Sequence, residues 1–401
     1  MKATGWPAIG ALGVAATRQR LTTLHDGLLR ATELCAAWVL AEADTWEKIR
    51  WGQEVWRFAR CVDAVHRRLA ELGGGPEAAA GRFYAELVNR MFEIDGAAAR
   101  AGALHGLILP DLRAVAVAQR ELTSSYCDEP SASTLTEVIA LLAEDPRPEV
   151  CPDAGLARLF RASGGLAGEV ALPAEEDRHP IARLVATPAR DPRLDVRPKV
   201  PRPPVAEHRV EFLHTLAFDI EICAAEICAR ILAEHTDAPW GLRFDMARQT
   251  WDEVRHAASL LLRVEALGGS LGMYPIDREI WHCFRAGDAL AEQLMIEQRL
   301  GEGQGLDGCL AIHGKLLACG DAETAAIFEY ILADEINHVR RGNFWIRHLL
   351  GGDERALAAL EAQARAKLVG LGIDLSVGPV DVAVRRQAGF TDAEIAAMSG
   401  S

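Results

Sequence analysis

The sequence lacks the features that would place the chain in a membrane or outside the cell. Its 401 residues contain no run of about 18 apolar residues, so we expect no membrane-spanning segment. The first residues lack the charged-then-apolar layout of a secretory signal. Nine cysteines occur without any Cys-x-x-Cys pair, which favours reduced thiols over a disulfide framework. These absences predict a cytoplasmic protein without membrane contact.

Positive charge is scarce relative to negative charge. The 43 Lys and Arg residues are outnumbered by 57 Asp and Glu residues, which gives a formal net charge of −14. A chain of this charge would repel a phosphate backbone. The charge therefore argues against nucleic acid as a partner and favours a small-molecule substrate.

Tyr, Thr and Asn are also sparse, and only four tyrosines occur. Ala, Leu, Glu and Arg dominate, and these residues favour helices. Half of the residues are hydrophobic and a quarter are charged, as in ordinary globular proteins. The composition predicts an all-α fold, and the length allows two or three domains.

The order of helical patterns, prolines and glycines predicts four segments. Residues 1–150 form an N-terminal helical domain of amphipathic helices. Residues 151–204 form a Pro-rich extended connector, because six prolines from Pro188 onward crowd its end and rule out a long helix there. Residues 205–350 form a four-helix bundle, and residues 351–401 form a helical tail.

The connector is locally basic. Between Arg178 and Arg209 there are eight Lys or Arg residues against three Asp or Glu residues. One interpretation is a solvated linker that lies on an acidic body. The other is an entry surface for an anionic substrate.

The bundle helices are expected over four ranges, of which the third leaves room for a break: 205–235, 242–267, 277–319 and 322–350. Glycine pairs follow the second and fourth ranges and would end those helices. In the tail, Thr391 and Glu394 have the spacing of a capping box, which predicts a last short helix.

The N-terminal half contains a faint copy of the second bundle helix. Trp56, Arg60 and Arg68 match Trp251, Arg255 and Arg263 at one constant offset. In that register Phe58 stands where Glu253 stands, and Cys61 where His256 stands. The N-terminal domain is thus either a degenerate bundle repeat that cannot hold metal or a chance match between Ala-rich helices.

A doubled motif carries the chemistry of the second half. Asp-Glu-x-x-His occurs at 252–256 and again at 334–338. The Glu-x-x-His part is common here, with five occurrences, so the shared preceding Asp is what distinguishes these two. A spacing of three residues puts Glu and His on one helix face, where both can reach the same metal ion. The Asp suits a second-shell role, in which it accepts the far N–H of a ligand imidazole.

A single glutamate precedes each motif by a similar interval. Glu221 lies 32 residues before Glu253, and Glu302 lies 33 residues before Glu335. Glu297 is the alternative on the third helix, although its interval would be 38 residues. We prefer Glu302, and the glycines on either side of it predict a local bulge or a close backbone approach.

These residues together predict a cage for two metal ions. The predicted ligands are Glu221, Glu253, His256, Glu302, Glu335 and His338, with Asp252 and Asp334 in support. Mixed carboxylate and imidazole donors suit iron or manganese better than the thiolate-rich sites of structural zinc.

The predicted ligand set resembles that of the ferritin-like di-iron carboxylate superfamily. More specifically, the stretch from about 190 to 396 resembles a ferritin-like branch catalogued as domain of unknown function 455. The residues that carry this resemblance are Asp191-Pro192-Arg193, Leu213-His214, the two Asp-Glu-x-x-His motifs, Glu302-Gly303 and Ala388-Gly389-Phe390. The branch is similar to tRNA-modifying di-iron hydroxylases, so the resemblance implies a ferritin-like four-helix bundle and oxygen-dependent hydroxylation.

Three functions remain open at this point. The preferred one is a di-iron oxygenase or oxidase that activates O2 to oxidise a small molecule, with specialised biosynthesis as one setting and with an external electron donor. The alternatives are a tRNA-base hydroxylase and a non-catalytic iron-binding or ferroxidase protein. Two Fe ions are expected, with Mn or mixed Fe/Mn as alternatives, and a homodimer is one option for the oligomeric state.

Overall fold

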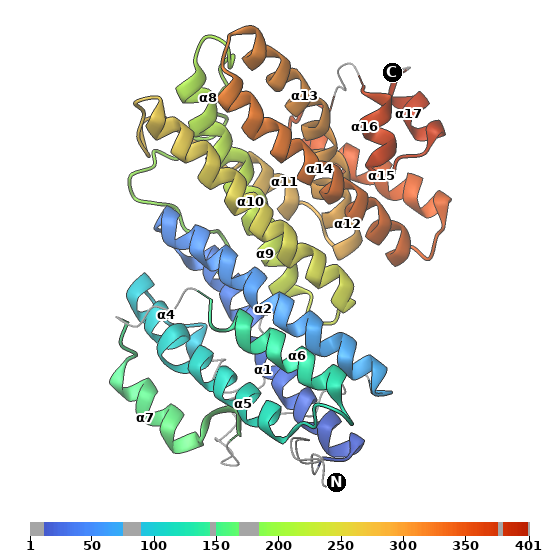
Figure 1. Cartoon of the computed structure of the whole chain (residues 1–401). Helices are drawn as coiled ribbons and strands as arrows, with labels where there is room; N and C mark the ends of the chain where they lie inside the picture. The colour runs from blue at the N-terminus through green and yellow to red at the C-terminus, as the bar shows by residue number, and fades with distance from the viewer. Residues whose placement is uncertain (1–11, 75–89, 145–149, 168–183, 376–379, 400–401) are drawn as a thin grey trace. The chain divides into compact units, whose positions relative to one another are not determined.

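The computed structural model describes residues 12–74, 90–144, 150–167, 184–375 and 380–399. Within these ranges the regular elements are helices, apart from one isolated parallel bridge between Val196 and Ile276. The predicted all-α fold is therefore confirmed (Figure 1).

The chain divides into two compact units. The first comprises Met1–Ala189 together with Leu232–Thr236, and the second comprises Arg190–Ile231 together with Asp237–Ser401. The second unit thus holds the tail and the bundle helices, except for the last residues of the first bundle helix.

Unit 1 is built on a pair of long helices, α1 (Val14–Ala41) and α2 (Thr45–Glu71). The Asp44 side chain starts α2 by accepting a hydrogen bond from the Glu47 backbone N–H. The other helices among the described residues of this unit are α4 (Ala97–Ala103), the π-helical turn η1 (Leu104–Ile108), α5 (Leu109–Leu122), α6 (Glu129–Leu141), α7 (Ala154–Ser163) and the short 3-10 helix η2 (Gly165–Ala167). Phe58 and Cys61, the residues that the proposed repeat aligns with Glu253 and His256, are fully buried in α2.

Among the described residues, one helix of unit 1 has the length and apolar composition of a membrane span, although the sequence contains no run of about 18 apolar residues. This continuous helix, Ala97–Leu122, is long and apolar enough to cross a membrane, and 39% of its 18-residue apolar stretch is buried within the protein. It carries Arg100, which forms a buried ion pair with Glu42 at 2.8 Å. A single such helix is weak evidence for a span, because core helices of soluble proteins pass the same test.

The sequence predicted an extended connector over residues 151–204, but the structure has a helix within this range. Helix α7 lies near its start, where Asp153 accepts hydrogen bonds from the Gly155 and Leu156 N–H groups. Gly164 ends α7 in the left-handed conformation, with φ 76°. The prolines act only further along, where the described residues 184–204 contain no helix. There the Arg197 N–H donates to the Ile276 carbonyl at 2.8 Å.

Unit 2 contains the four predicted bundle helices, two of them interrupted. The first consists of α8 (Arg209–Leu216), the π-helical turn η4 (Ala217–Glu221) and α9 (Ile222–Glu234). The second is α10 (Trp240–Ala266). The third comprises α11 (Glu279–Arg285), α12 (Leu290–Leu294), the π-helical turn η5 (Met295–Gly301) and α13 (Glu302–Ala318). The fourth is α14 (Ala322–Leu349).

The tail forms three helices that pack on the bundle: α15 (Glu354–Gly370), α16 (Val382–Gln387) and α17 (Asp392–Ser399). A small apolar core of Leu306, Val339, Ala388, Phe390 and Ile395 joins the tail to α13 and α14. The predicted capping box is present. The Thr391 N–H donates to the Glu394 carboxylate at 2.7 Å, and the Glu394 N–H donates to the Thr391 hydroxyl at 3.3 Å.

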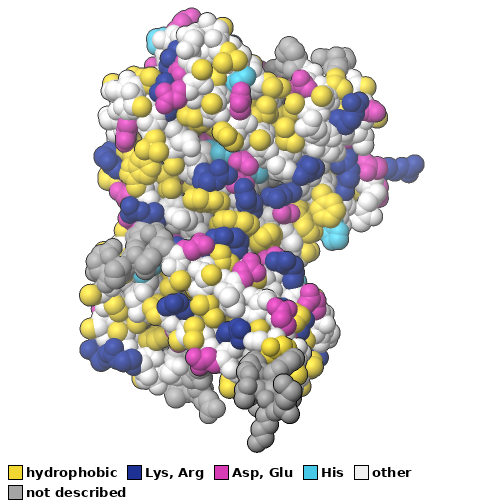
Figure 2. Space-filling model, in the orientation of Figure 1, with side chains coloured by type: hydrophobic (Ala, Val, Ile, Leu, Met, Phe, Trp, Pro, Cys, Tyr) yellow, Lys and Arg dark blue, Asp and Glu magenta, His cyan; other side chains and the backbone are white. Residues whose placement is uncertain are grey.

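The excess of negative charge does not make the surface uniformly acidic. On the face drawn in Figure 2, Lys and Arg side chains are interspersed with acidic and hydrophobic ones. Several arginines of unit 2 form ion pairs, such as Arg263 with Asp321 at 3.0 Å and Arg347 with Glu394 at 2.8 Å.

Candidate metal centre

Each of the two single glutamates lies at the C-terminal end of a π-helical turn. Glu221 is the last residue of η4, and Glu302 is the first residue after η5. In a π-helical turn the hydrogen bond spans five residues instead of four, which rotates the following side chains relative to a regular helix. The bulge predicted at Glu302 is therefore present, and a second one lies at Glu221.

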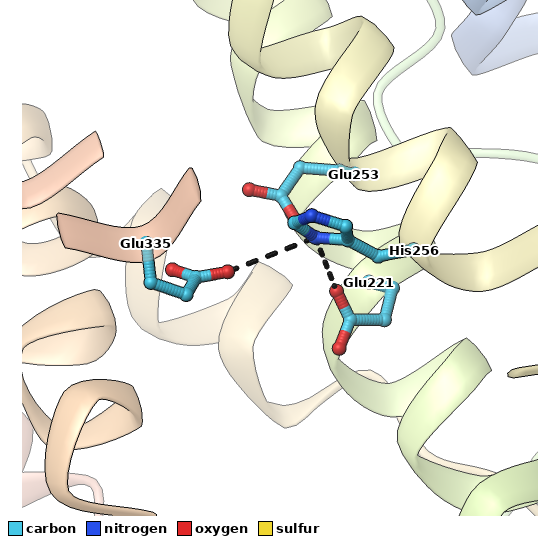
Figure 3. A group of neighbouring side chains, drawn as sticks. All are labelled: Glu221, Glu253, His256 and Glu335. Atoms are coloured by element: carbon cyan, nitrogen blue, oxygen red, sulfur yellow. Dashed lines mark hydrogen bonds and ion pairs between the residues drawn. The ribbon is translucent and has the colours of Figure 1, made fainter. Parts of the chain in front are cut away.

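All six predicted ligands come together in the centre of unit 2. Their donor atoms form two groups, and within each group the atoms lie within 4.8 Å of one another. One group is Glu221, Glu253, His256 and Glu335, which Figure 3 shows converging from three segments. The other group is Glu253, Glu302, Glu335 and His338. Glu253 and Glu335 belong to both groups, so the two groups share a pair of carboxylates.

Both imidazoles direct Nδ1 toward the carboxylates. His256 Nδ1 lies 3.2 Å from Glu221 and Glu253, and 3.7 Å from Glu335. His338 Nδ1 lies 3.1 Å from Glu253 and 3.5 Å from Glu335. Each ring thus has its nearer nitrogen available as a ligand atom on one side of the shared pair.

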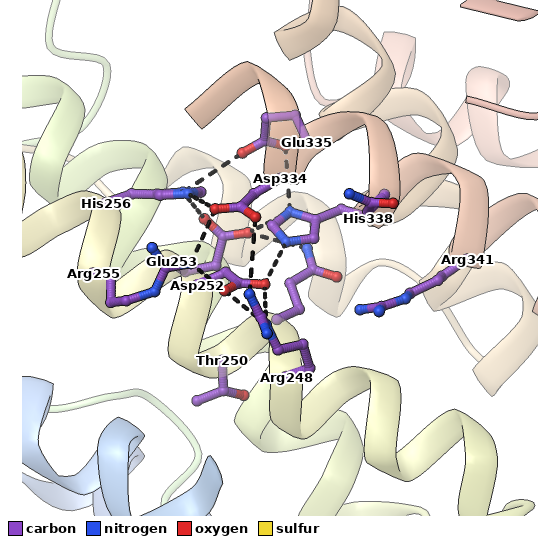
Figure 4. A network of polar contacts seen from close by, with 12 residues as sticks. Arg248, Thr250, Asp252, Glu253, Arg255, His256, Asp334, Glu335, His338 and Arg341 are labelled. Carbon is purple, nitrogen blue, oxygen red and sulfur yellow. Dashed lines mark hydrogen bonds and ion pairs between the residues drawn. The ribbon is translucent and has the colours of Figure 1, made fainter. Parts of the chain in front are cut away.

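The two aspartates support the histidines crosswise. His256 Nε2 lies 3.2 Å from Asp334, and His338 Nε2 lies 3.4 Å from Asp252 (Figure 4). Each aspartate therefore contacts the histidine of the other motif, where it can accept the Nε2–H and leave Nδ1 free for a metal ion. The Arg255 guanidinium donates to both aspartates, at 2.9 Å in the case of Asp334.

Burial governs the electrostatics of this cluster. It raises the pKa of Glu221 to about 7 and that of Glu335 well above its usual range. Burial alone would lower the pKa of His338, but Glu253 and Asp252 outweigh it and raise the value to about 10. Burial likewise opposes the charge of His256, whose pKa is nevertheless raised by Asp334 and the surrounding glutamates. The carboxylates therefore require compensating positive charge, which protons on the imidazoles or metal ions can supply.

The donor set fits two divalent metal ions. Glu335 Oε2 and His338 Nδ1 are buried and make no hydrogen bond within the described part of the chain. Four ionised carboxylates carry four negative charges, which two divalent cations would neutralise. The cluster can thus hold a metal pair, with the aspartates orienting the imidazoles.

The geometry favours Glu302 over Glu297 as the ligand from the third helix, because Glu302 belongs to a group and Glu297 does not. The Glu302 N–H donates to the Glu297 carbonyl across η5. Burial raises the pKa of Glu297 well above its usual range, and the neighbouring Glu302 and Glu253 add to the effect. Glu297 is thus a further buried acid next to the cage, and its pKa favours the uncharged form.

Sequence reasoning missed one polar residue of the site. The Gln249 amide donates to Glu253 at 3.1 Å and to Glu302 at 3.0 Å, so it connects the two carboxylates across the bundle. Its position four residues before Glu253 puts it on the same helix face, which could have identified it. Two buried thiols, Cys228 and Cys309, also lie close enough to experience the charge of the cage glutamates.

The fold and the cluster define an all-helical protein with a buried carboxylate and histidine site. Comparison with protein families identifies the chain further. Residues 157–396 match the family described as "Protein of unknown function (DUF455)". Because this match covers more than half of the chain, the protein belongs to that family.

A curated relative and the solved structures add little more. An uncharacterized protein of Haemophilus influenzae is 28% identical over 158 residues, which cover 39% of this chain and 54% of the relative. The chain thus spans about half the length of the curated relative it matches. No solved structure matches the chain.

Proposed function

We propose that unit 2 is a ferritin-like bundle that holds two iron ions, and that the protein is an O2-dependent oxidoreductase, an oxygenase or oxidase, acting on a small molecule. The observation that carries the proposal is the pair of ligand groups that share Glu253 and Glu335. A single mononuclear site would not explain two complete sets of three carboxylates and one imidazole.

The roles of the residues follow from their positions. Glu221 and His256 would hold one ion and Glu302 and His338 the other, and the shared Glu253 and Glu335 would be available to both. When bound, two ferrous ions would supply the electrons that activate dioxygen, which is the oxidant for the substrate, and an external donor would supply the electrons that return the ions to the ferrous state. Manganese, alone or mixed with iron, is compatible with the same donors.

The surrounding residues would keep this chemistry in place. Asp252 and Asp334 hold the imidazoles through Nε2, and Arg255 holds the two aspartates together. The glutamates are buried in the bundle, so bulk water is kept from their oxygens. Preorganised ligands of this kind lower the cost of arranging the centre at the moment of reaction.

The other two interpretations use the same cage. A ferroxidase or iron-binding protein needs the cage but no substrate. A tRNA-base hydroxylase needs a surface for RNA, and the net charge of −14 argues against one.

All nine cysteines are free thiols, which supports the proposed cytoplasmic location.

The proposal is tested by loading the anaerobic protein with Fe(II), mixing it with oxygen and recording absorption spectra from milliseconds onward. We expect about two irons per chain, as the two ligand groups require, and a transient absorption that forms and decays after mixing. Binding of fewer than one iron per chain would contradict the metal centre. Release of mineralised ferric iron, with no transient absorption and no product from any added substrate, would favour the ferroxidase alternative.

A further inference from the structure

A pocket of about 380 Å³ opens in unit 2 where three segments meet. It is lined by residues 196–199 of the connector, residues 277–283 around the start of α11, and Leu371 and Ile373 beyond α15. The volume falls within the range of about 300–1,000 Å³ that small-molecule sites usually occupy. The pocket therefore has room for a small ligand.

The pocket carries cationic side chains that form no side-chain hydrogen bond or ion pair with the described residues. Lys199, Arg278 and His282 make no side-chain hydrogen bond or ion pair with the residues that the structure describes, and Arg278 Nε is buried. Asp277, by contrast, accepts hydrogen bonds from the backbone N–H groups of Val200 and Glu279, at 3.0 and 2.9 Å. Glu279 is the remaining acid of the lining. A buried guanidinium nitrogen that has no hydrogen-bond acceptor favours an anionic ligand.

Lys199 has an unusual backbone conformation. Its φ of 53° is the only positive value for a residue other than glycine in the described part of the chain. This conformation is unfavourable for lysine, and such strain occurs often at functional sites. It brings the Lys199 ammonium group close to Gly372, beside the two apolar residues of the third wall.

The rest of the lining is apolar. Val196, Pro198, Cys283, Leu371 and Ile373 provide this surface. Val196 and Leu371 are 41% and 45% exposed, so apolar side chains also stand open to solvent. The pocket thus combines an apolar surface with cationic groups, and it suits a ligand that has both an apolar body and a negative charge.

One wall of the pocket, helix α11, lies next to the segment that leads to Glu302. Helix α11 packs against η5, the turn that precedes Glu302. Cys283 of α11 lines the pocket and is 8% exposed. Burial raises the pKa of the Cys283 thiol to about 12, and the charges of Glu279 and Glu297 add to this effect. Cys283 and Glu297 thus lie on two elements that pack against each other, α11 and η5.

We propose that this pocket binds a small organic anion with an apolar body, whose charged group contacts Lys199 and Arg278, and presents it to the metal centre. The inference rests on the proposed function, because it names the substrate class of the same centre. It also gives the basic connector a role as an entry surface, the second interpretation of its charge.

The test compares two probes of the same shape, octanoate and the uncharged octanamide. Binding of each to the full-length protein is measured by calorimetry, with and without Fe(II). The variant Lys199→Gln/Arg278→Gln removes the pocket charges, and Lys315→Gln/Arg355→Gln removes two exposed charges elsewhere in unit 2. We expect octanoate to bind the pocket variant at least about tenfold more weakly, since a hydrogen bond to a charged group contributes about that factor.

Further measurements address the route to the metals. Val196→Trp adds bulk at the exposed mouth, and we expect it to weaken octanoate binding without altering the fold, as judged by circular dichroism. Octanoate is also expected to change the near-infrared circular dichroism of the ferrous protein, and this change should be absent in Val196→Trp. Equal binding of octanamide, or equal weakening in the Lys315→Gln/Arg355→Gln control, would overturn the pocket proposal.

Two outcomes separate this inference from the proposed function. If the protein binds no Fe(II) but binds octanoate in a charge-dependent way, the metal centre is refuted and the anion pocket stands as a ligand site. If octanoate binds while the ferrous spectrum stays unchanged, the link between pocket and centre is overturned.

Discussion

Replacing Glu253 by glutamine is expected to abolish binding of both metal ions, whereas replacing Glu221 by glutamine is expected to abolish only one. The difference follows from the two ligand groups, since Glu253 is a member of both and Glu221 of one. By the same reasoning Glu335→Gln resembles Glu253→Gln, and Glu302→Gln resembles Glu221→Gln. The parent protein is expected to hold about two metal ions per chain. This content should fall toward zero in Glu253→Gln and Glu335→Gln, and to about one in Glu221→Gln and Glu302→Gln.

The magnitude follows from charge and ligand count. Each group offers three carboxylates and one imidazole, and the four carboxylates together balance two divalent ions. Loss of a shared carboxylate removes a ligand from both ions and leaves a net positive charge in a buried site. Changes to supporting residues alone reduce metal affinity by about 10–100-fold, so loss of a bridging ligand is expected to cost at least about 100-fold at each ion.

The assay is anaerobic titration with Fe(II), followed by desalting and measurement of metal content. Glu211→Gln serves as the matched control, because Glu211 begins another Glu-x-x-His pair with His214 but belongs to neither ligand group. The control should retain about two ions per chain. Equal losses in Glu253→Gln and Glu221→Gln, or two ions retained in Glu253→Gln, would refute the shared arrangement.

Two further predictions concern stability. Burial lowers the pKa of His214 from its ordinary value of 6.5 to about 4, and its Nε2 accepts the Gly272 N–H at 3.0 Å. Below pH 6.5 the unfolded chain therefore binds the proton more readily, and up to about 3 kcal/mol of stability is lost as the pH falls toward 4. Denaturant unfolding of His214→Gln should lack this part of the pH dependence, and an unchanged profile would contradict the assignment. A Cβ at Gly342 would lie 2.3 Å from Gln298 Cβ of η5, so Gly342→Ala should destabilise unit 2 by about 1–3 kcal/mol. Thermal melts of the variants measure this loss. Gly314→Ala in α13 is the control, because Gly314 has open space around it, and this substitution should be neutral or stabilising. Equal losses of stability in both variants would refute the close contact.

The regular helices were predictable because their signals are local. The sequence placed the second and fourth bundle helices at 242–267 and 322–350, and the structure has Trp240–Ala266 and Ala322–Leu349. Apolar periodicity and terminal glycines decide these boundaries within a few residues of the chain. The break within 277–319 was allowed for, but its division into α11, α12, η5 and α13 was not foreseen.

Contacts between helices were harder to foresee. Each aspartate was expected to support an imidazole, but the crosswise pairing of Asp334 with His256 depends on how α10 and α14 are aligned. Gln249 joins Glu253 to Glu302 only because α10 and α13 present them to one another. The pocket likewise combines segments that are distant in the sequence.

The sequence by itself determined that the chain is helical, where its long helices run, and which six residues could serve as metal ligands. Helical periodicity and the repeated motif express these properties over short distances, where neighbouring residues decide the outcome. Only the tertiary structure decided that Glu253 and Glu335 are shared, that Glu221 and Glu302 lie at the ends of η4 and η5 close to them, and that three distant segments form one pocket. These features arise where side chains from separate helices pack together, and their relative positions are fixed by the fold as a whole.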